Sequence, residues 1–218
     1  QHCSQGHFPH DPDCEACIRA RLTTKPGHRR ALDEPIMGSD KGYVMGVDFV
    51  GPYVPDVDGN VWGFVGVEVA HTDYGFVELS SDREASTAKA SLQSARLELE
   101  TKSHDSKTLK RVHHDKDSSF KGDFSKYLSD ERIVDTDTSG YRPTNNSRTE
   151  RRNRTLKESF KACLLMATGG IGVYNALWGP GLKHANYCVN RIAWSDGRVP
   201  YTALTNTTHT YDPSQDKV

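Results

Sequence analysis

Three acidic residues stand where carboxylates could carry out metal-dependent chemistry. Asp48 lies in a short apolar segment before a Gly-Pro break, and Asp115 follows an alternating apolar run. Glu150 opens an arginine-rich segment further along the chain. Carboxylates suit Mg²⁺, which binds oxygen ligands and keeps part of its water shell. Three of them could hold two Mg²⁺ or Mn²⁺ ions about 3.5–4 Å apart, one activating an attacking oxygen and one stabilising a leaving oxygen.

The segment that Glu150 opens has the pattern of a helix with a cationic face. At about 100° per residue, polar and basic residues fall on the side of Glu150 and apolar residues fall opposite. The polar side contains Asn153, Arg154, Lys157 and Lys161, and the apolar side contains Leu156, Phe160, Cys163 and Ala167. Such cations hold a nucleic-acid backbone in register without reading its sequence. A solvated charged helix has the same pattern, so the run alone does not decide between the two.

Two longer patterns resemble the catalytic cores of retroviral and retrotransposon integrases, the DDE polynucleotidyl transferases, and most of all those of copia-type elements. In that family the second acid lies in H-S-D-N-G-x-E-F, and the third in Y-x-P-x-x-N-G-x-x-E-R-x-N-R-x-L. At the positions of the first pattern the chain has His113, His114, Asp115 and Phe120, with His114 where the pattern has Ser. At the positions of the second it has Tyr141, Pro143, Asn146, Glu150, Arg151, Asn153, Arg154 and Leu156. Asp117, Ser119 and Ser147 depart from the family pattern, which has Gly, Glu and Gly there.

The resemblance implies a set of roles for the matching residues. Asp48, Asp115 and Glu150 would be the catalytic acids and would bind two Mg²⁺ or Mn²⁺ ions. The expected DNA contacts are Arg151, Asn153, Arg154, Lys157, Lys161 and, in the loop before the helix, Tyr141. The implied partners are double-stranded DNA, as element ends and target, and further copies of the chain.

The order of predicted elements is that of a ribonuclease H-like fold, an α/β mixed sheet flanked by helices. Three runs rich in β-branched or aromatic residues predict an antiparallel meander. A helix over 84–102 then makes a right-handed crossover, which returns the strand 109–114 parallel to the first strand. Asp48 and Asp115 would then lie side by side. The strands of the meander are expected at 43–49, 61–70 and 74–79, with later elements at 120–128 (helix), 132–135 (strand), the Glu150 helix and 173–192 (helix).

The beginning of the chain has the pattern of a small zinc site. Cys14 and Cys17 form a C-x₂-C pair with several histidines close by. Zn²⁺ takes four N or S ligands in a tetrahedron, and a short segment with few apolar residues would gain folding energy from it. We expect His7, Cys14 and Cys17 as ligands, with His28 or His2 as the fourth. His28 is favoured because His2 is close to the terminus. Incidental His and Cys residues are the alternative.

This segment also resembles the His-His-Cys-Cys module that precedes integrase cores, although its His-to-Cys separation is shorter. We therefore expect a zinc module at 1–30, a linker at 31–41, the catalytic core at 42–205 and a polar tail at 206–218. The 218 residues allow one main domain with a small appendage.

Composition limits the classes of protein that fit. The net charge is −1, so a DNA-binding surface must come from local clustering of cations. Five cysteines, an odd number, argue against a disulfide framework. No apolar run approaches the roughly 20 residues of a membrane span, and no signal-peptide pattern is present. We expect an intracellular protein without a membrane partner, acting in the nucleus if the host is eukaryotic. Because the sequence begins at Gln1, we expect a segment of a polyprotein.

The leading hypothesis is a retroelement integrase that inserts element DNA by metal-dependent 3′-end processing and strand transfer. A ribonuclease H-type nuclease would share the three acids, although the Arg-x-Asn-Arg segment and the Cys pair favour an integrase. A decayed DNA-binding remnant without activity is the non-enzymatic alternative, because of the departures at Asp117, Ser119 and Ser147.

Overall fold

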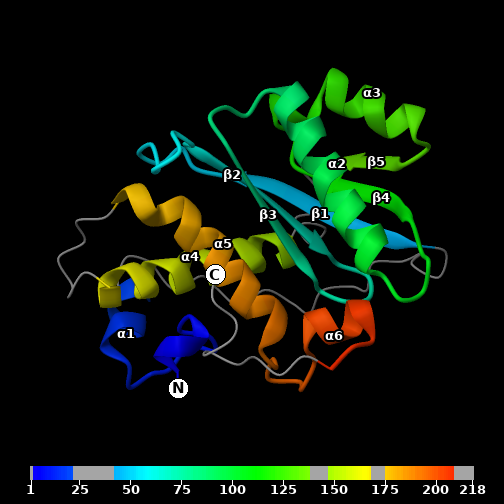
Figure 1. The fold of residues 1–218 in the computed structure, drawn as a ribbon. Helices are drawn as coiled ribbons and strands as arrows, with labels where there is room; N and C mark the ends of the chain where they lie inside the picture. The colour runs from blue at the N-terminus through cyan, green and yellow to red at the C-terminus, as the bar shows by residue number, and fades with distance from the viewer. Residues whose placement is uncertain (1, 22–41, 138–146, 168–174, 209–218) are drawn as a thin grey trace.

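A five-stranded mixed sheet with helices on both faces forms the centre of the protein (Figure 1). The computed structural model describes residues 2–21, 42–137, 147–167 and 175–208. The strand order is β3-β2-β1-β4-β5, with β1 antiparallel to β2 and parallel to β4. The strands are Tyr43–Val50 (β1), Trp62–Glu68 (β2), Gly75–Ser80 (β3), Leu109–His114 (β4) and Val134–Asp137 (β5). This arrangement confirms the predicted antiparallel meander, crossover and parallel return.

Helices connect and cover the strands. They are Glu15–Arg21 (α1), Ala85–Lys102 (α2), Asp123–Asp130 (α3), Ser147–Ala167 (α4), Trp178–Arg191 (α5) and Pro200–Thr205 (α6). Short 3₁₀ turns occupy Cys3–Gln5, Ser118–Phe120 and Asn175–Leu177. None of the helices in the described part of the chain is both long and apolar enough to cross a bilayer.

Some predicted boundaries were wrong. The helix expected at 120–128 begins later, because Asp117 accepts a hydrogen bond from Ser119 N (2.9 Å) and stabilises a 3₁₀ turn before it. The strand expected at 132–135 lies two residues further along, at Val134–Asp137. The last helical region is split into a 3₁₀ turn and α5, and α6 was not predicted.

The strands bury side chains on both faces. On β2, Phe64 packs with the cluster under α2 and α3, whereas its neighbour Val65 packs with Leu156 and Trp178 under α4 and α5. Successive strand residues point to opposite faces. A sheet covered on both faces therefore needs apolar residues at nearly every position of its central strands.

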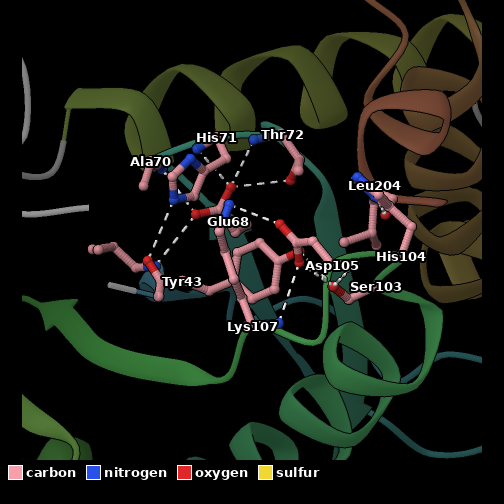
Figure 2. A network of polar contacts seen from close by, with 12 residues as sticks. Tyr43, Glu68, Ala70, His71, Thr72, Ser103, His104, Asp105, Lys107 and Leu204 are labelled. Atoms are coloured by element: carbon pink, nitrogen blue, oxygen red, sulfur yellow. Dashed lines mark hydrogen bonds and ion pairs between the residues drawn. The ribbon is translucent and has the colours of Figure 1, made fainter. Parts of the chain in front are cut away.

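A buried carboxylate fixes the sheet at the start of β1 (Figure 2). Glu68 is fully buried and accepts backbone N–H groups from Ala70 (2.9 Å), His71 (2.9 Å) and Thr72 (2.7 Å) in the turn after β2. A weaker bond comes from Val44 N on β1, at 3.3 Å. These donors replace the water that a buried carboxylate loses, so Glu68 holds the turn against the neighbouring strand.

The same end of the sheet is tied to the segment after α2 (Figure 2). The Tyr43 hydroxyl lies 2.7 Å from Ser103 Oγ and donates to Asp105 Oδ1 at 2.8 Å. Lys107 Nζ lies 2.7 Å from the other oxygen of Asp105. Burial raises the pKa of Tyr43 to about 12, so the hydroxyl keeps its proton and its donor role.

The N-terminal segment packs directly on the core. Ala16 and Ala20 of α1 contact Ala162 and Leu165 of α4 in a small apolar cluster. Figure 1 shows α1 against one end of α4. The predicted linker at 31–41 and residues 209–218 of the predicted tail lie outside the described residues.

A second set of contacts joins the start of the chain to α4 and α5. Ser159 Oγ donates to the carbonyl of Gly6, and the ring of Phe8 lies edge-on to Trp194. Gly6 has φ +66°, and a Cβ there would come within 2.9 Å of Cys188 Sγ. Only glycine suits a position with both that backbone angle and so close a neighbour.

Candidate active site and metal cluster

Asp48 and Asp115 reach the same edge of the sheet from neighbouring strands. Asp48 lies in β1, and Asp115 directly follows β4. The parallel register pairs Gly46 with His113, so the two acids stand level with each other two residues further along. The strand order therefore produces the juxtaposition that the crossover argument predicted.

Asp115 and Glu150 both act electrostatically on Asp48. The pKa of Asp48 is raised to about 6, first by burial and then by the negative charge of Asp115, with a smaller contribution from Glu150. The N–H of Phe49 and the cation of Lys157 act in the opposite direction. A divalent cation would relieve this crowding of carboxylates, so the arrangement fits the predicted magnesium ligands.

A pocket of about 320 Å³ lies beside Asp48, between β1, α4 and α1. Its lining residues are Ala20, Asp48, Glu150, Asn153, Arg154, Lys157, Glu158 and Lys161. Glu150 is exposed and belongs to the first turn of α4, where the positive end of the helix dipole favours a carboxylate. The expectation that Glu150 opens the helix was wrong, because α4 begins three residues earlier, at Ser147.

Three of the predicted DNA-binding cations share this pocket with Asp48 and Glu150. Arg154, Lys157 and Lys161 all line it, as the helical spacing predicted for one face of α4. Arg151 is exposed on the same helix. Tyr141 lies outside the described residues, so its role stays a prediction.

Asn153 makes a contact that the sequence did not indicate. Its Nδ2 donates to Asp48 Oδ2 at 2.7 Å, and only 6% of the residue is exposed. Phe49 N donates to the other carboxylate oxygen at 2.8 Å. The Asp48 carboxylate is thus oriented by two donors, and Asn153 faces the acid from α4.

Arg152 is a buried residue that the sequence reasoning missed. Its Nη2 donates to Asn186 Oδ1 and to Asn190 Oδ1, both at 2.6 Å, and Asn190 also accepts Gly75 N at 2.9 Å. The guanidinium therefore joins α4 to α5 and β3 on the side of the helix away from Glu150. The helical spacing contained the signal, because Arg152 falls among the apolar positions.

A second group of ligand-type residues lies in the N-terminal segment. The ligand atoms of His2, His7, Cys14 and Cys17 all lie within 4.8 Å of one another. His7 Nδ1 is 3.4 Å from Cys14 Sγ and 3.6 Å from Cys17 Sγ, and His2 Nε2 is 3.2 Å from Cys17 Sγ. Two nitrogens and two sulfurs match the donor set of structural zinc. This group contains His2, whereas His28 lies outside the described residues.

The protonation chemistry of this cluster also suits a metal. Burial lowers the pKa of His7, which favours the neutral imidazole that binds metals. Burial also raises the pKa of Cys17 to about 11, so a free thiol would stay protonated there. A bound cation would stabilise the thiolate form.

The chain is similar in structure to solved proteins, although no match is found by sequence. No protein-family model matches the chain, and no curated protein matches it. The HTLV-2 integrase catalytic core domain, solved with magnesium in a trimeric form, aligns with a TM-score of 0.55 at 13% identity, covering 77% of this chain and 99% of that chain. The BIV integrase catalytic core aligns with a TM-score of 0.50 at 18% identity, covering 75% and 93%.

A third solved structure aligns over more of this chain. It is the simian T-cell lymphotropic virus intasome in complex with the PP2A regulatory subunit B56 gamma, with a TM-score of 0.60 at 15% identity. The alignment covers 82% of this chain and 60% of that chain. At these identities the likenesses establish the fold, which is the ribonuclease H-like fold of integrase catalytic cores.

Proposed function

We propose that the chain is part of a retroelement integrase and inserts element DNA into target DNA. The observation that supports the proposal most is that the charges of Asp115 and Glu150 both act on Asp48, beside a pocket that the cations of α4 line. The integrase-core fold and the copia-like sequence patterns support it.

The geometry suggests how the residues would divide the work. Asp48, Asp115 and Glu150 would hold two Mg²⁺ or Mn²⁺ ions, and bound ions supply activation of the attacking oxygen and stabilisation of the leaving oxygen. Asn153 holds the Asp48 carboxylate in place. Lys157 and its cationic neighbours would bind DNA phosphates and orient them for in-line attack.

Two successive displacements would follow. Water would attack a phosphodiester near the 3′ end of the element DNA, breaking a P–O bond and leaving a 3′-OH. That hydroxyl would then attack a phosphodiester of the target, joining the two DNAs and releasing a new 3′-OH on the target strand. Neither step needs a covalent bond to the protein.

The N-terminal cluster would bind Zn²⁺ through His7, Cys14, Cys17 and a further histidine, His2 or His28. Its role would be structural, because four protein ligands leave no open position for substrate. A multimer that bridges two DNA ends is the proposed assembly. The trimeric form of the HTLV-2 core and the intasome among the structural neighbours support it.

Nicking and strand-transfer assays on short DNA duplexes with Mg²⁺ or Mn²⁺ test this proposal. The change Glu150→Gln should lower both activities by about 10³-fold or more, since it removes a metal ligand. Glu84→Gln is the matched control, because Glu84 is an exposed acid at the start of α2. Cleavage of RNA–DNA hybrids without strand transfer would favour the nuclease alternative. DNA binding without any metal-dependent cleavage would favour the inactive remnant.

A further inference from the structure

His114 connects the strand end that carries Asp115 to the next strand of the sheet. Its Nδ1 lies 2.7 Å from the backbone carbonyl oxygen of Asp115, and its Nε2 lies 2.7 Å from Asp135 Oδ1 on β5. Ser125 Oγ of α3 donates to the second oxygen of Asp135 at 3.0 Å. A chain of polar contacts therefore runs from α3 through β5 to the backbone of Asp115.

The imidazole ring is fixed by its surroundings. His114 is 5% exposed. Its ring centroid lies 4.8 Å from that of Phe120 and 5.7 Å from that of Phe124, which stands perpendicular to it. With the ring plane set by these aromatic neighbours, the directions of both nitrogens are also set.

The three acids differ in their place on the backbone. Asp48 lies within β1 and Glu150 within α4, so regular backbone hydrogen bonds hold both of them. β4 ends at His114, and Asp115 is the first residue beyond it. A carbonyl oxygen only accepts hydrogen bonds, so Nδ1 of His114 donates to it and restrains the peptide that follows Asp115.

We propose that His114 and Asp135 are a positioning pair, which holds the backbone of Asp115 so that its carboxylate meets a metal shared with Asp48. The pair would act through the backbone of Asp115 and not on the substrate itself, and its role rests on the proposed function. The copia-like pattern has Ser before this acid, so the imidazole link belongs to this chain.

Binding of Mn²⁺ to the full chain, followed by the EPR signal of the free ion, tests the proposal without an activity assay. The key comparison is His114→Asn against His114→Gln. Both variants lose the ring contacts with Phe120 and Phe124. The amide nitrogen of Asn takes the place of Nδ1 and can still reach the Asp115 carbonyl, whereas that of Gln takes the place of Nε2 and reaches only Asp135.

We expect His114→Gln and Asp135→Asn to weaken Mn²⁺ binding about 10-fold, as loss of an outer-shell partner does, and His114→Asn to weaken it less than about 3-fold. Asp130→Asn makes the same chemical change at an exposed site on α3 and should bind as the wild type does. Equal affinities for the two His114 variants, or wild-type affinity for Asp135→Asn, would overturn the proposal.

Two further variants distinguish failure of the positioning role from failure of the proposed function. Ser125→Ala removes the outer anchor of Asp135, together with the contact of Ser125 Oγ with the Phe120 carbonyl, and leaves the His114 ring in place. It therefore still tests the pair if the His114 variants do not fold. We expect Ser125→Ala to weaken Mn²⁺ binding about 2–3-fold, which is less than the effect of losing Asp135 itself. Wild-type affinity in this variant would count against the proposed pair. If Glu150→Gln binds Mn²⁺ as tightly as the wild type, the proposed function fails. If Glu150→Gln loses Mn²⁺ affinity but the variants at His114, Asp135 and Ser125 bind Mn²⁺ as the wild type does, the positioning role fails and the proposed function stands.

Discussion

The two candidate metal sites of this protein are built in opposite ways. The four ligand-type residues of the N-terminal cluster come from one short segment, residues 2–17, and their ligand atoms already lie together. The three acids come from segments that are far apart in the chain. The sheet register brings Asp48 and Asp115 level with each other, and the packing of α4 brings Glu150 to the pocket beside Asp48. The cluster therefore depends on local structure, whereas the acid site depends on packing throughout the core.

The two sites also differ in the atoms that would bind a metal. Sulfur and imidazole donors in a set that is half buried, through His7 and Cys17, suit a structural zinc ion. Carboxylates beside cations, of which Asp48 is partly buried and Asp115 and Glu150 are exposed, suit an ion that also binds a substrate phosphate. The contrast predicts that changes elsewhere in the core will affect the acid site and leave the cluster intact.

The largest expected effect is the loss of zinc on breaking the cluster. Cys17→Ser should lower the zinc content from one per chain to near zero, because structural zinc sites contribute on the order of 10 kcal/mol of binding free energy. Zinc content by mass spectrometry and limited proteolysis of the N-terminal segment measure it. Cys3→Ser, at an exposed cysteine outside the cluster, is the control. Melting of the core together with this segment would contradict the predicted domain boundary near residue 42.

A clash on the side of α4 away from Glu150 should affect the acid site and not the N-terminal cluster. A Cβ at Gly75 would come within 2.3 Å of Arg152 Nη2, so Gly75→Ala should displace the anchor of α4 and destabilise the core by about 2–3 kcal/mol. We expect weaker Mn²⁺ binding with unchanged zinc content, measured by urea unfolding and metal titration. Gly181→Ala, whose Cβ would meet only ordinary contacts, is the control. Loss of zinc in Gly75→Ala would show that the two sites are not independent.

The metal-free acid site should make the protein less stable as pH rises. The pKa of Asp48 goes from 3.8 when unfolded to about 6 when folded, so the folded state binds the proton more tightly. Its contribution is complete below pH 3.8 and is lost as pH rises through about 6, at a cost of about 2–3 kcal/mol. Urea unfolding between pH 4.5 and pH 8 should show this loss in the wild type and not in Asp48→Asn. A parallel pH dependence in both would disprove the assignment to Asp48.

The smallest expected effect concerns the cations of α4. Removing Lys157 and Lys161 together should lower the slope of log K against log salt for DNA binding by about 1–2, because each phosphate contact releases about one counterion. Lys110 on β4 and Lys126 on α3 are exposed and lie outside the pocket. Replacing both removes the same charge and should leave the slope unchanged. Equal slopes for both double variants would place the DNA elsewhere.

The sequence predicted the fold well because hydrophobic periodicity and crossover handedness act over whole elements. The strand expected at 109–114 was found with the same bounds, and the expected neighbour relation of Asp48 and Asp115 follows from the register. Boundaries set by single side chains, such as the 3₁₀ turn at Asp117, could not be predicted this way. They depend on one hydrogen bond each and not on a repeated pattern.

A site contact could be predicted from the sequence when its residues lie close together in the chain. Cys14 and Cys17 could be identified from spacing alone. The bond from Asn153 to Asp48 and the link from His114 to Asp135 each join residues from separate elements, and no spacing in the sequence indicates them. Arg152 is buried because Asn186 and Asn190, from a separate helix, supply hydrogen-bond acceptors, and this pairing is likewise not visible in the spacing.

The contact between α1 and α4 has a practical consequence for truncated forms. Ala162 is 1% exposed beneath α1, and Leu165 is covered beside it. A shortened protein starting at Gly42 would present this apolar strip to water and lose Ala20 from the wall of the acid pocket. Such a fragment should self-associate at high concentration, and polar substitutions at those two α4 positions should restore a monodisperse sample without restoring the missing wall.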